Sequence, residues 1–186
     1  MRTRGALMIE HRLIERMLAV VGRLVAEADR RQQLDPLLVD TVADFIRTYA
    51  DRTHHGKEEG ILFRDLAMKP MSARDRQLLR ELTEEHVFGR GVTGELVAAN
   101  ERYRRGDASA LPAVTGALRA LKDFYPKHIA KEDGEFFLAY RAYLSEDEEQ
   151  AMVREFCDFD RKLIHEKYRA VCDGLSGRYG AEGPQA

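Results

Sequence analysis

The amino-acid sequence predicts an all-α protein, organised as an up-down-up-down four-helix bundle with an additional C-terminal helix. Apolar residues recur three and four positions apart through four long segments, and no useful length of sequence alternates as a strand does. Short breaks separate these segments, as expected for antiparallel helices joined by turns. The composition agrees, because 186 residues with 44% hydrophobic residues and only five prolines are typical of a soluble helical protein.

Capping signals bound the first helices. An apolar stripe at helical spacing predicts the first helix from about Leu7 to Arg30. Asp35 followed by Pro36 has the residue types that begin a second helix, an N-cap and a proline in the first turn. The proline-containing segment 69–72 ends this helix, and its last residue, Ser72, can cap the third.

The remaining helices follow a polar loop at residues 105–109. The fourth helix is expected after this loop, with an apolar stripe that reaches Phe136. Ser145 and Glu148 have the capping-box pattern, which predicts a fifth helix through about Cys172. We therefore expect three regions: a bundle at residues 1–142, a helix packed on or beside it at 143–174, and a flexible tail at 175–186.

A motif occurs twice without gaps, as His54-x-x-x-Glu58 and His128-x-x-x-Glu132. Each copy has a lysine before the glutamate and two large apolar residues eight and nine positions after the histidine. A spacing of four places both side chains on one helix face, one turn apart. A single pair of this kind is commonly an exposed contact, but two copies within apolar stripes indicate a shared buried site.

One histidine from each of the four helices is expected at the same level of the core. The set is His11, His54, His86 and His128. Residues on neighbouring antiparallel helices are level when the turn lies midway between them in sequence. The midpoints between successive members fall at 32.5, 70 and 107, each inside a predicted turn.

Four imidazoles and two carboxylates in a core require a compensating ion. Two carboxylates can each bridge a pair of divalent ions, which leaves two imidazoles for each ion. We expect His11 with His54 on one ion and His86 with His128 on the other, although a permuted pairing satisfies the same count. Nitrogen and oxygen ligands without thiolate suit iron, manganese or zinc. The predicted metal ligands are His11, His54, Glu58, His86, His128 and Glu132.

Over about residues 7 to 140 the chain resembles the hemerythrin-like (HHE cation-binding) family. The resemblance rests on Glu10-His11, on Glu85-His86 followed by Gly89-Arg90, and on the two repeated motifs followed by Leu62-Phe63 and Phe136-Phe137. It implies a four-helix bundle with a non-haem centre of two iron ions, oxo- or hydroxo-bridged, that binds O₂ or NO. Oxygen-carrying members have a second histidine on the third helix, where this chain has Arg90, so one ligand of that pattern is absent.

Several neighbouring residues compete with the predicted ligands or surround them. His55 and Glu59 repeat the spacing of the preferred pair one residue later, and the alignment of the repeat favours the earlier pair. Asp133 competes in the same way with Glu132. Tyr125, one turn before the histidine of the fourth helix, either fills the core or offers its hydroxyl to a metal-bound oxygen.

Other residues have two interpretations each. Glu10 and Glu85 precede ligand histidines, and we expect them to face solvent or to support a neighbouring imidazole. Three glycines of the third helix either leave room for a small ligand near His86 or permit close helix contact: Gly89, Gly91 and Gly94. His165, on the fifth helix, is not expected to be a ligand.

Several classes of protein are not supported. A net charge of −2 gives no reason to expect nucleic acid as a partner. No stretch approaches the roughly 20 apolar residues of a membrane span, and charged residues interrupt the N-terminal apolar stretch that a signal peptide would need. Cys157 and Cys172 would lie roughly 22 Å apart on one helix, too far for a disulfide. A cytoplasmic protein with free thiols is expected.

The functional expectation is a protein that binds or senses O₂ or NO at a carboxylate-bridged di-iron site. One alternative is a di-iron redox enzyme for NO reduction, peroxide reduction or iron donation in iron–sulfur repair. Another is a structural bundle that holds zinc or no metal. The sequence identifies no catalytic residue and no redox partner, and it is compatible with an oligomer.

Overall fold

The computed structural model describes the backbone of residues 2–179 and the side chains of residues 2–163. These residues form helices and turns, and no strand occurs among them. The expectation of an all-α protein is therefore confirmed. The predicted flexible tail at 175–186 lies largely outside the described residues.

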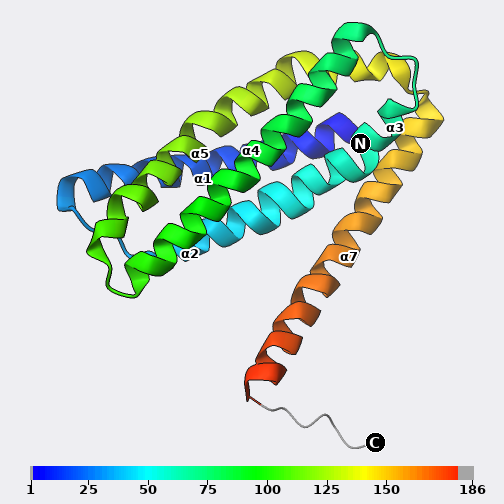
Figure 1. The fold of residues 1–186 in the computed structure, drawn as a ribbon. Helices are drawn as coiled ribbons and strands as arrows, with labels where there is room; N and C mark the ends of the chain where they lie inside the picture. The colour runs from blue at the N-terminus through cyan, green and yellow to red at the C-terminus, as the bar shows by residue number, and fades with distance from the viewer. Residues whose placement is uncertain (1, 180–186) are drawn as a thin grey trace, which may run out of the picture.

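Four helical rods lie side by side (Figure 1). The first rod is α1 (Thr3–Arg31), and the third is α4 (Ala73–Arg104). The second rod, residues 36–67, comprises α2 (Pro36–Phe45), the π-helical segments η1 (Ile46–His55) and η2 (Glu58–Phe63), and α3 (Arg64–Ala67). The fourth rod, residues 111–139, comprises α5 (Leu111–Lys131), the π-helical segment η4 (Glu132–Phe136) and α6 (Phe137–Ala139). Two 3-10 turns and a long last helix complete the chain: η3 (Ala108–Ala110), η5 (Tyr140–Tyr143) and α7 (Glu146–Tyr179).

The predicted capping residues begin the helices. The Asp35 carboxylate accepts the backbone N–H two residues later at 2.9 Å, and the Ser72 hydroxyl accepts the N–H three residues later at 3.1 Å. Ser145 and Glu148 form both bonds of the capping box, at 2.9 and 3.3 Å. Each bond satisfies an N–H group that the first turn of a helix leaves without a partner. The last helix, α7, continues past its expected end near Cys172.

The interior consists of two apolar clusters with a polar layer between them. The large cluster includes Ile14, Val21, Leu96, Leu118 and Leu121, and the end cluster includes Leu7, Leu62, Leu82, Phe136 and Phe137. On α1, the end cluster comes first and the large cluster second, so His11 lies between them. The next rod meets the clusters in the opposite order, and this alternation continues through the third and fourth rods.

The last helix packs on the part of the second rod that carries histidines. Phe156 joins the end cluster, and the Asp160 carboxylate accepts a hydrogen bond from the Lys57 ammonium at 2.9 Å. A Cβ atom at Gly56 would lie 2.8 Å from the Phe159 ring, so glycine leaves room for this ring. Figure 1 shows α7 then running away from the four rods.

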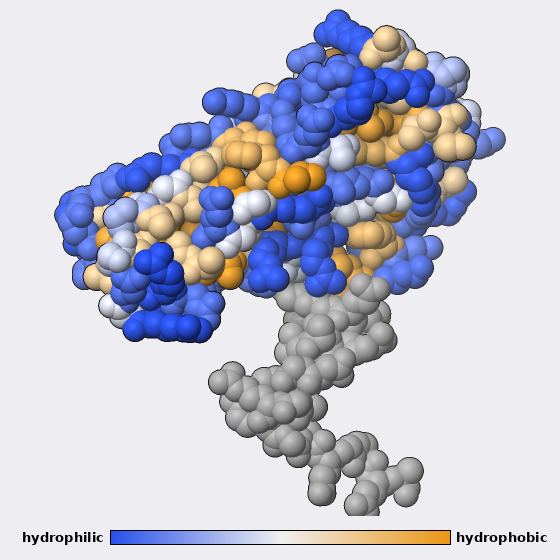
Figure 2. Space-filling model, viewed as in Figure 1, coloured by the Kyte–Doolittle hydropathy of each residue, from blue (hydrophilic) through white to orange (hydrophobic). Residues whose placement is uncertain are grey.

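Hydrophilic side chains cover most of the face shown in Figure 2, with apolar patches between them. Within residues 2–179, no helix has both the length and the apolar character that crossing a membrane requires. Cys157 is exposed and free, and the side chain of Cys172 lies outside the described part.

Candidate metal centre

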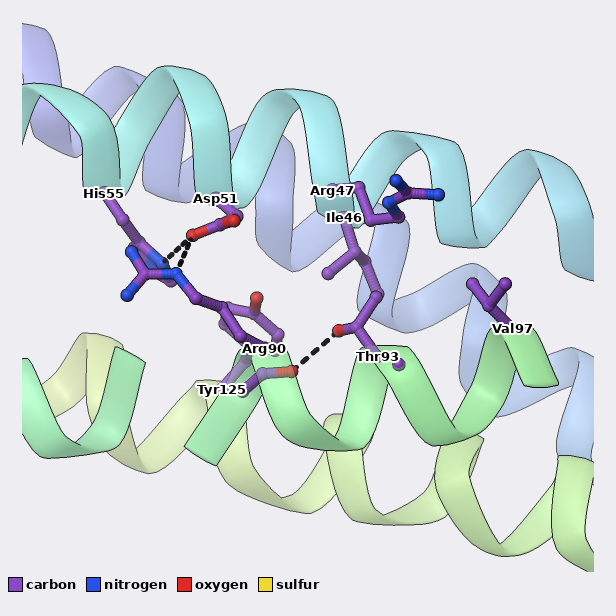
Figure 3. Close-up of a pocket in the computed structure, with 10 residues that line it drawn as sticks. Ile46, Arg47, Asp51, His55, Arg90, Thr93, Val97 and Tyr125 are labelled. Atoms are coloured by element: carbon purple, nitrogen blue, oxygen red, sulfur yellow. Dashed lines mark hydrogen bonds and ion pairs between the residues drawn. The ribbon is translucent and has the colours of Figure 1, made fainter. Parts of the chain in front are cut away.

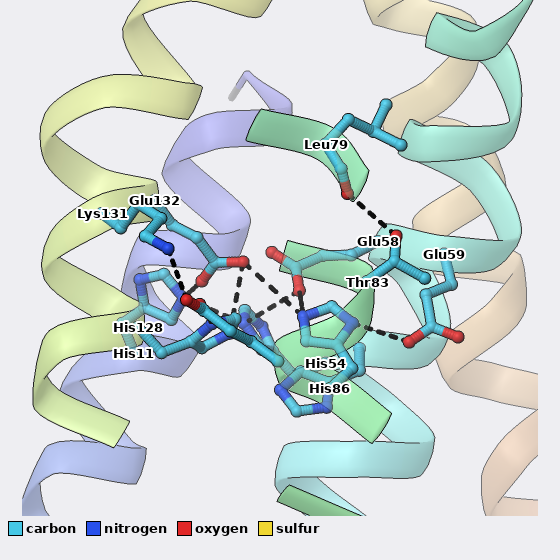
Figure 4. Close-up of polar contacts among 12 residues, drawn as sticks. His11, His54, Glu58, Glu59, Leu79, Thr83, His86, His128, Lys131 and Glu132 are labelled. Atoms are coloured by element: carbon cyan, nitrogen blue, oxygen red, sulfur yellow. Dashed lines mark hydrogen bonds and ion pairs between the residues drawn. The ribbon is translucent and has the colours of Figure 1, made fainter. Parts of the chain in front are cut away.

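Five of the six histidines gather in the polar layer between the two apolar clusters, together with Glu58 and Glu132. Figure 4 shows side chains converging on this layer from all four rods. None of the seven side chains is more than 2% exposed. All six residues that the sequence predicts as ligands are brought together, and His55 joins them. The side chain of His165 lies beyond the described side chains.

The first group consists of His11, His54, Glu58 and Glu132, whose potential ligand atoms all lie within 4.8 Å of one another. The Nε2 atoms of His11 and His54 are 2.9 Å apart, and Glu132 Oε2 lies 3.1 Å from His11 Nε2. Two neutral imidazoles in this position, each with its proton on Nδ1, would direct their lone pairs at each other. A proton or a metal ion between the two nitrogens removes this repulsion.

The second group consists of His55, His86 and His128, again with ligand atoms within 4.8 Å of one another. The His55 and His86 rings stack at a centroid distance of 3.8 Å and an interplanar angle of 8°. From the sequence, two imidazoles are expected in this group, and His55 is a rival to His54. The structure instead buries both neighbours, one in each group.

Both buried carboxylates face the two groups at once. Glu132 directs Oε2 at His11, while its Oε1 lies 3.4 Å from His128 Nε2 and 3.7 Å from His86 Nε2. Glu58 Oε2 lies 3.6 Å from His54 Nε2 and 3.4 Å from His86 Nε2. Glu132 does so with different oxygens and Glu58 with a single one, and each lies within reach of both groups.

The two copies of the repeated motif share a local irregularity, because the glutamate of each begins a π-helical segment. A further π-helical segment, η1, ends at His55. Its i→i+5 bonds put more residues in each turn, which reduces the angle between consecutive side chains. His54 and His55 therefore both enter the core. Periodicity predicts regular helices and so does not reveal this feature, although π-helical turns are frequent at functional sites.

A second row of carboxylates, here called the outer carboxylates, meets the Nδ1 atoms of the imidazoles. Four accept hydrogen bonds: Asp133 from His11 at 2.8 Å, Glu10 from His54 at 2.9 Å, Glu59 from His86 at 2.6 Å, and Glu85 from His128 at 2.8 Å. The fifth, Asp51, lies 3.5 Å from His55 Nδ1. Donation from Nδ1 leaves the Nε2 lone pair free to bind an ion, and such partners fix the ring orientation of metal-binding histidines. Glu59 and Asp133, which the sequence left as rival ligands, lie in this outer row.

Cationic side chains pair with every outer carboxylate. Lys57 contacts Glu10, Lys131 contacts Glu85, Arg12 contacts Asp133, and Arg90 contacts both Glu59 and Asp51. Although burial acts in the opposite direction, the hydrogen bond from His54 lowers the pKa of Glu10. In the same way, and again against the effect of burial, the hydrogen bond from His86 lowers the pKa of Glu59 and the one from His128 lowers the pKa of Glu85. The outer carboxylates that titrate in this way are therefore held ionised.

The inner groups differ in their protonation. Burial and the nearby charge of Glu132 raise the pKa of Glu58 well above its usual range. Burial also acts to raise the pKa of Glu132, but the surrounding histidines outweigh it and hold that pKa well below its usual range. Burial lowers the pKa of His54 to about 4 and that of His55 well below its ordinary value.

His11 and His86 behave in the opposite way. Burial alone would lower the pKa of each imidazole, but Glu132 and the outer carboxylate at each ring raise it. In the absence of metal, Glu58 and these two histidines therefore keep their protons to a higher pH than they would in water.

The inner side chains fit a metal ion. Among the described residues, both oxygens of Glu58 and of Glu132, Nε2 of His86 and of His128, and both ring nitrogens of His55 are buried without a hydrogen-bond partner. Orphaned buried polar atoms are rare and costly. These atoms are lone-pair donors of the nitrogen and oxygen type that iron, manganese and zinc accept. The two groups therefore fit a cation-binding site.

Comparison with known proteins agrees with this geometry. The family model described as the hemerythrin HHE cation-binding domain matches residues 4–140, which carry all seven inner side chains. No curated protein and no solved structure matched the chain significantly. The family model covers well over half of the chain, and the chain therefore belongs to the hemerythrin HHE cation-binding domain family.

Proposed function

We propose that the chain binds two iron ions between its four rods and that this centre binds or senses O₂ or NO. The observation that carries the proposal is the pair of carboxylates, Glu58 and Glu132, each of which faces both groups of imidazoles. The alternating order of the apolar clusters supports an up-down-up-down four-helix bundle as the scaffold. In this architecture residues 1–142 form the bundle and residues 143–174 the added helix.

The proposed ligands are the six residues expected from the sequence together with His55. His55, His86 and His128 would serve one ion, His11 and His54 the other, and the two carboxylates would bridge them. The second ion then has fewer protein ligands, so it has more room for a diatomic ligand. When bound, the iron pair would supply electrons to such a ligand. Apolar clusters lie on both sides of the layer and limit the access of water from those sides.

The outer carboxylates would hold each imidazole in the tautomer and orientation that binding requires. Cations hold these carboxylates in place, and Lys57 is the most buried of them. Its ammonium is only 1% exposed and contacts both Glu10 and Asp160. The position of the His54 ring is therefore fixed through Glu10 by a buried lysine.

Metal analysis of the full chain, purified without chelators, tests the proposal. About two irons per chain are expected, and anaerobic reduction followed by O₂ or NO should change the optical spectrum. Zinc in place of iron, or no metal, would overturn the proposal in favour of a structural bundle. An unaltered spectrum with iron present would remove the diatomic ligand from it. Catalytic turnover with a reductant would instead indicate a redox enzyme.

Alanine variants test the ligand set. Replacing His54, Glu58 or His55 should lower the metal content, whereas His165→Ala serves as the control and should not. Because His54 and His55 belong to different groups, their variants should affect different ions. Full metal content in His55→Ala would contradict its assignment and leave six ligands.

A further inference from the structure

A cavity of about 440 Å³ opens between the second rod and α4, on the side of the metal centre that carries His55 (Figure 3). We call it the lateral slot. Ile46 and Val97 form apolar walls, and Gly94 lies on α4 beside them. An engineered cavity of about 150 Å³ holds one benzene molecule, so the lateral slot has room for roughly ten to fifteen non-hydrogen atoms. A diatomic gas needs far less space, and the size of the slot is therefore not explained by O₂ or NO.

The inner end of the lateral slot presents a hydroxyl without a partner. Tyr125 is only 1% exposed and lines the slot, yet its hydroxyl forms no hydrogen bond with a described residue. A Cβ atom at Gly89 would lie 3.8 Å from this oxygen, so the absence of a side chain there keeps the space in front of it open. Figure 3 shows Tyr125 reaching from α5 toward the second rod. The hydroxyl of a buried tyrosine normally finds a partner, and the lateral slot gives a ligand atom access to this one.

The outer part of the lateral slot has an available positive charge. Arg47 is exposed beside the slot and forms no ion pair or hydrogen bond with a described residue. Arg90, which also lines the slot, is instead engaged with Asp51 at 2.7 Å and with Glu59 at 2.6 Å. The slot therefore offers a free guanidinium, apolar walls and a deep hydroxyl. These groups complement an anion with an apolar body and a second oxygen.

We propose that the lateral slot binds a small organic acid of this kind, a hydroxy- or oxo-substituted monocarboxylate. Its carboxylate meets Arg47, its apolar body lies between Ile46 and Val97, and its distal oxygen exchanges a hydrogen bond with Tyr125. The distal oxygen then lies beside His55, next to the metal centre. Binding is non-covalent, and it involves none of the proposed metal ligands directly.

Isothermal titration calorimetry with the purified full chain tests the proposal, using 4-hydroxyphenylacetate as the probe. Phenylacetate lacks the distal oxygen, and 4-ethylphenol lacks the carboxylate. We expect saturable binding of the probe, weaker by about fivefold without the hydroxyl and by about tenfold or more without the carboxylate, from the strengths of neutral and charged hydrogen bonds. Equal binding of the three compounds, or no binding of any of them at millimolar concentration, would overturn the proposal.

A pair of glycine variants locates the site. Gly94→Leu should place a side chain in the lateral slot and abolish binding, because no described atom lies within 4 Å of its Cβ position to divert it. Gly91→Leu is the matched control, since Gly91 is also an exposed glycine of α4 with open space at Cβ but does not line the slot. Binding that survives Gly94→Leu, or is lost equally in both variants, would contradict the assignment.

Two conservative variants test the polar contacts. Tyr125→Phe keeps the ring and should weaken the probe but not phenylacetate, while Arg47→Gln should weaken both acids but not 4-ethylphenol. Metal content, measured on every variant, should stay at the level of the unmodified chain. A failed slot thus remains distinguishable from a failed metal centre. Equal effects of Tyr125→Phe on the probe and on phenylacetate would refute the contact with the hydroxyl.

Discussion

Metal binding at this centre should release protons, up to about three for each pair of divalent ions bound near pH 6. Imidazole and carboxyl groups must be deprotonated before they bind metal. His11 and His86 have raised pKa values, as does Glu58, so these three groups hold protons that an incoming ion has to displace. His54 has a pKa lowered to about 4, and it contributes no proton above about pH 5.

The charges around the layer give the same number. Seven carboxylates oppose four cations, which leaves three negative charges in excess when every imidazole is neutral. The carboxylates are Glu10, Asp51, Glu58, Glu59, Glu85, Glu132 and Asp133, and the cations are Arg12, Lys57, Arg90 and Lys131. Three bound protons neutralise this excess in the metal-free chain. Two divalent ions carry four positive charges, which more than offset this excess in the loaded chain.

The assay is anaerobic titration with Fe²⁺ in buffers of different ionisation enthalpy, which yields the number of protons released. Since groups with raised pKa values lose their protons as the pH rises, metal affinity should increase from pH 6 to pH 7. Each displaced proton can add up to about tenfold per pH unit, or about 1.4 kcal/mol, so three protons set an upper limit of about 4 kcal/mol. An affinity that is equal at pH 6 and pH 8 would refute this reasoning.

Three further variants test the supporting structure. Glu10→Gln removes the outer carboxylate of His54 and should weaken metal binding by about 10- to 100-fold in a competition titration. Glu27→Gln, on the same helix but far from the layer, is the control and should leave metal binding unchanged. Lys57→Met leaves Glu10 without its buried cation and should lower the free energy of unfolding in urea by about 2 to 3 kcal/mol. This loss is smaller than for breaking a fully buried ion pair, because Asp160, the other partner of Lys57, is half-exposed. Leu82→Ala in the end cluster should lower the free energy of unfolding by about 2 to 5 kcal/mol in the same assay. Val87 on the same helix is 60% exposed, and its replacement by alanine should change this free energy by no more than about 0.5 kcal/mol. A Leu82 variant as stable as the Val87 variant would contradict the assigned core.

Much of the scaffold follows from local physical chemistry. Helical periodicity, the caps at Asp35 and Ser72 and the capping box at Ser145 each depend on a few neighbouring residues, so they are legible in one sequence. The all-α class and the family are confirmed. The layer of histidines was predictable because, in antiparallel helices joined by short turns, the number of residues from the turn gives the height of each side chain in the bundle.

The assignment of His55 was not predictable in the same way. In a regular helix only one of two consecutive residues points into the core, so His54 and His55 are rivals for one inward position. The π-helical segment that ends at His55 changes the angle between consecutive side chains. The His55 ring then stacks on His86 of another rod, a contact that local sequence does not show. A second histidine directly after the first was the available signal.

Arg90 is a cation shared by two outer carboxylates. It stands where oxygen-carrying hemerythrins have a histidine, and its guanidinium donates instead to Asp51 and Glu59, which face His55 and His86. One cation thus contacts the carboxylates that face two imidazoles, and it is not itself a proposed ligand. Arg90→Met should therefore weaken metal binding by at least the 10- to 100-fold typical of one supporting residue while leaving every proposed ligand in place. If the competition titration showed unchanged affinity for this variant, the outer carboxylates would not be positioning His55 and His86.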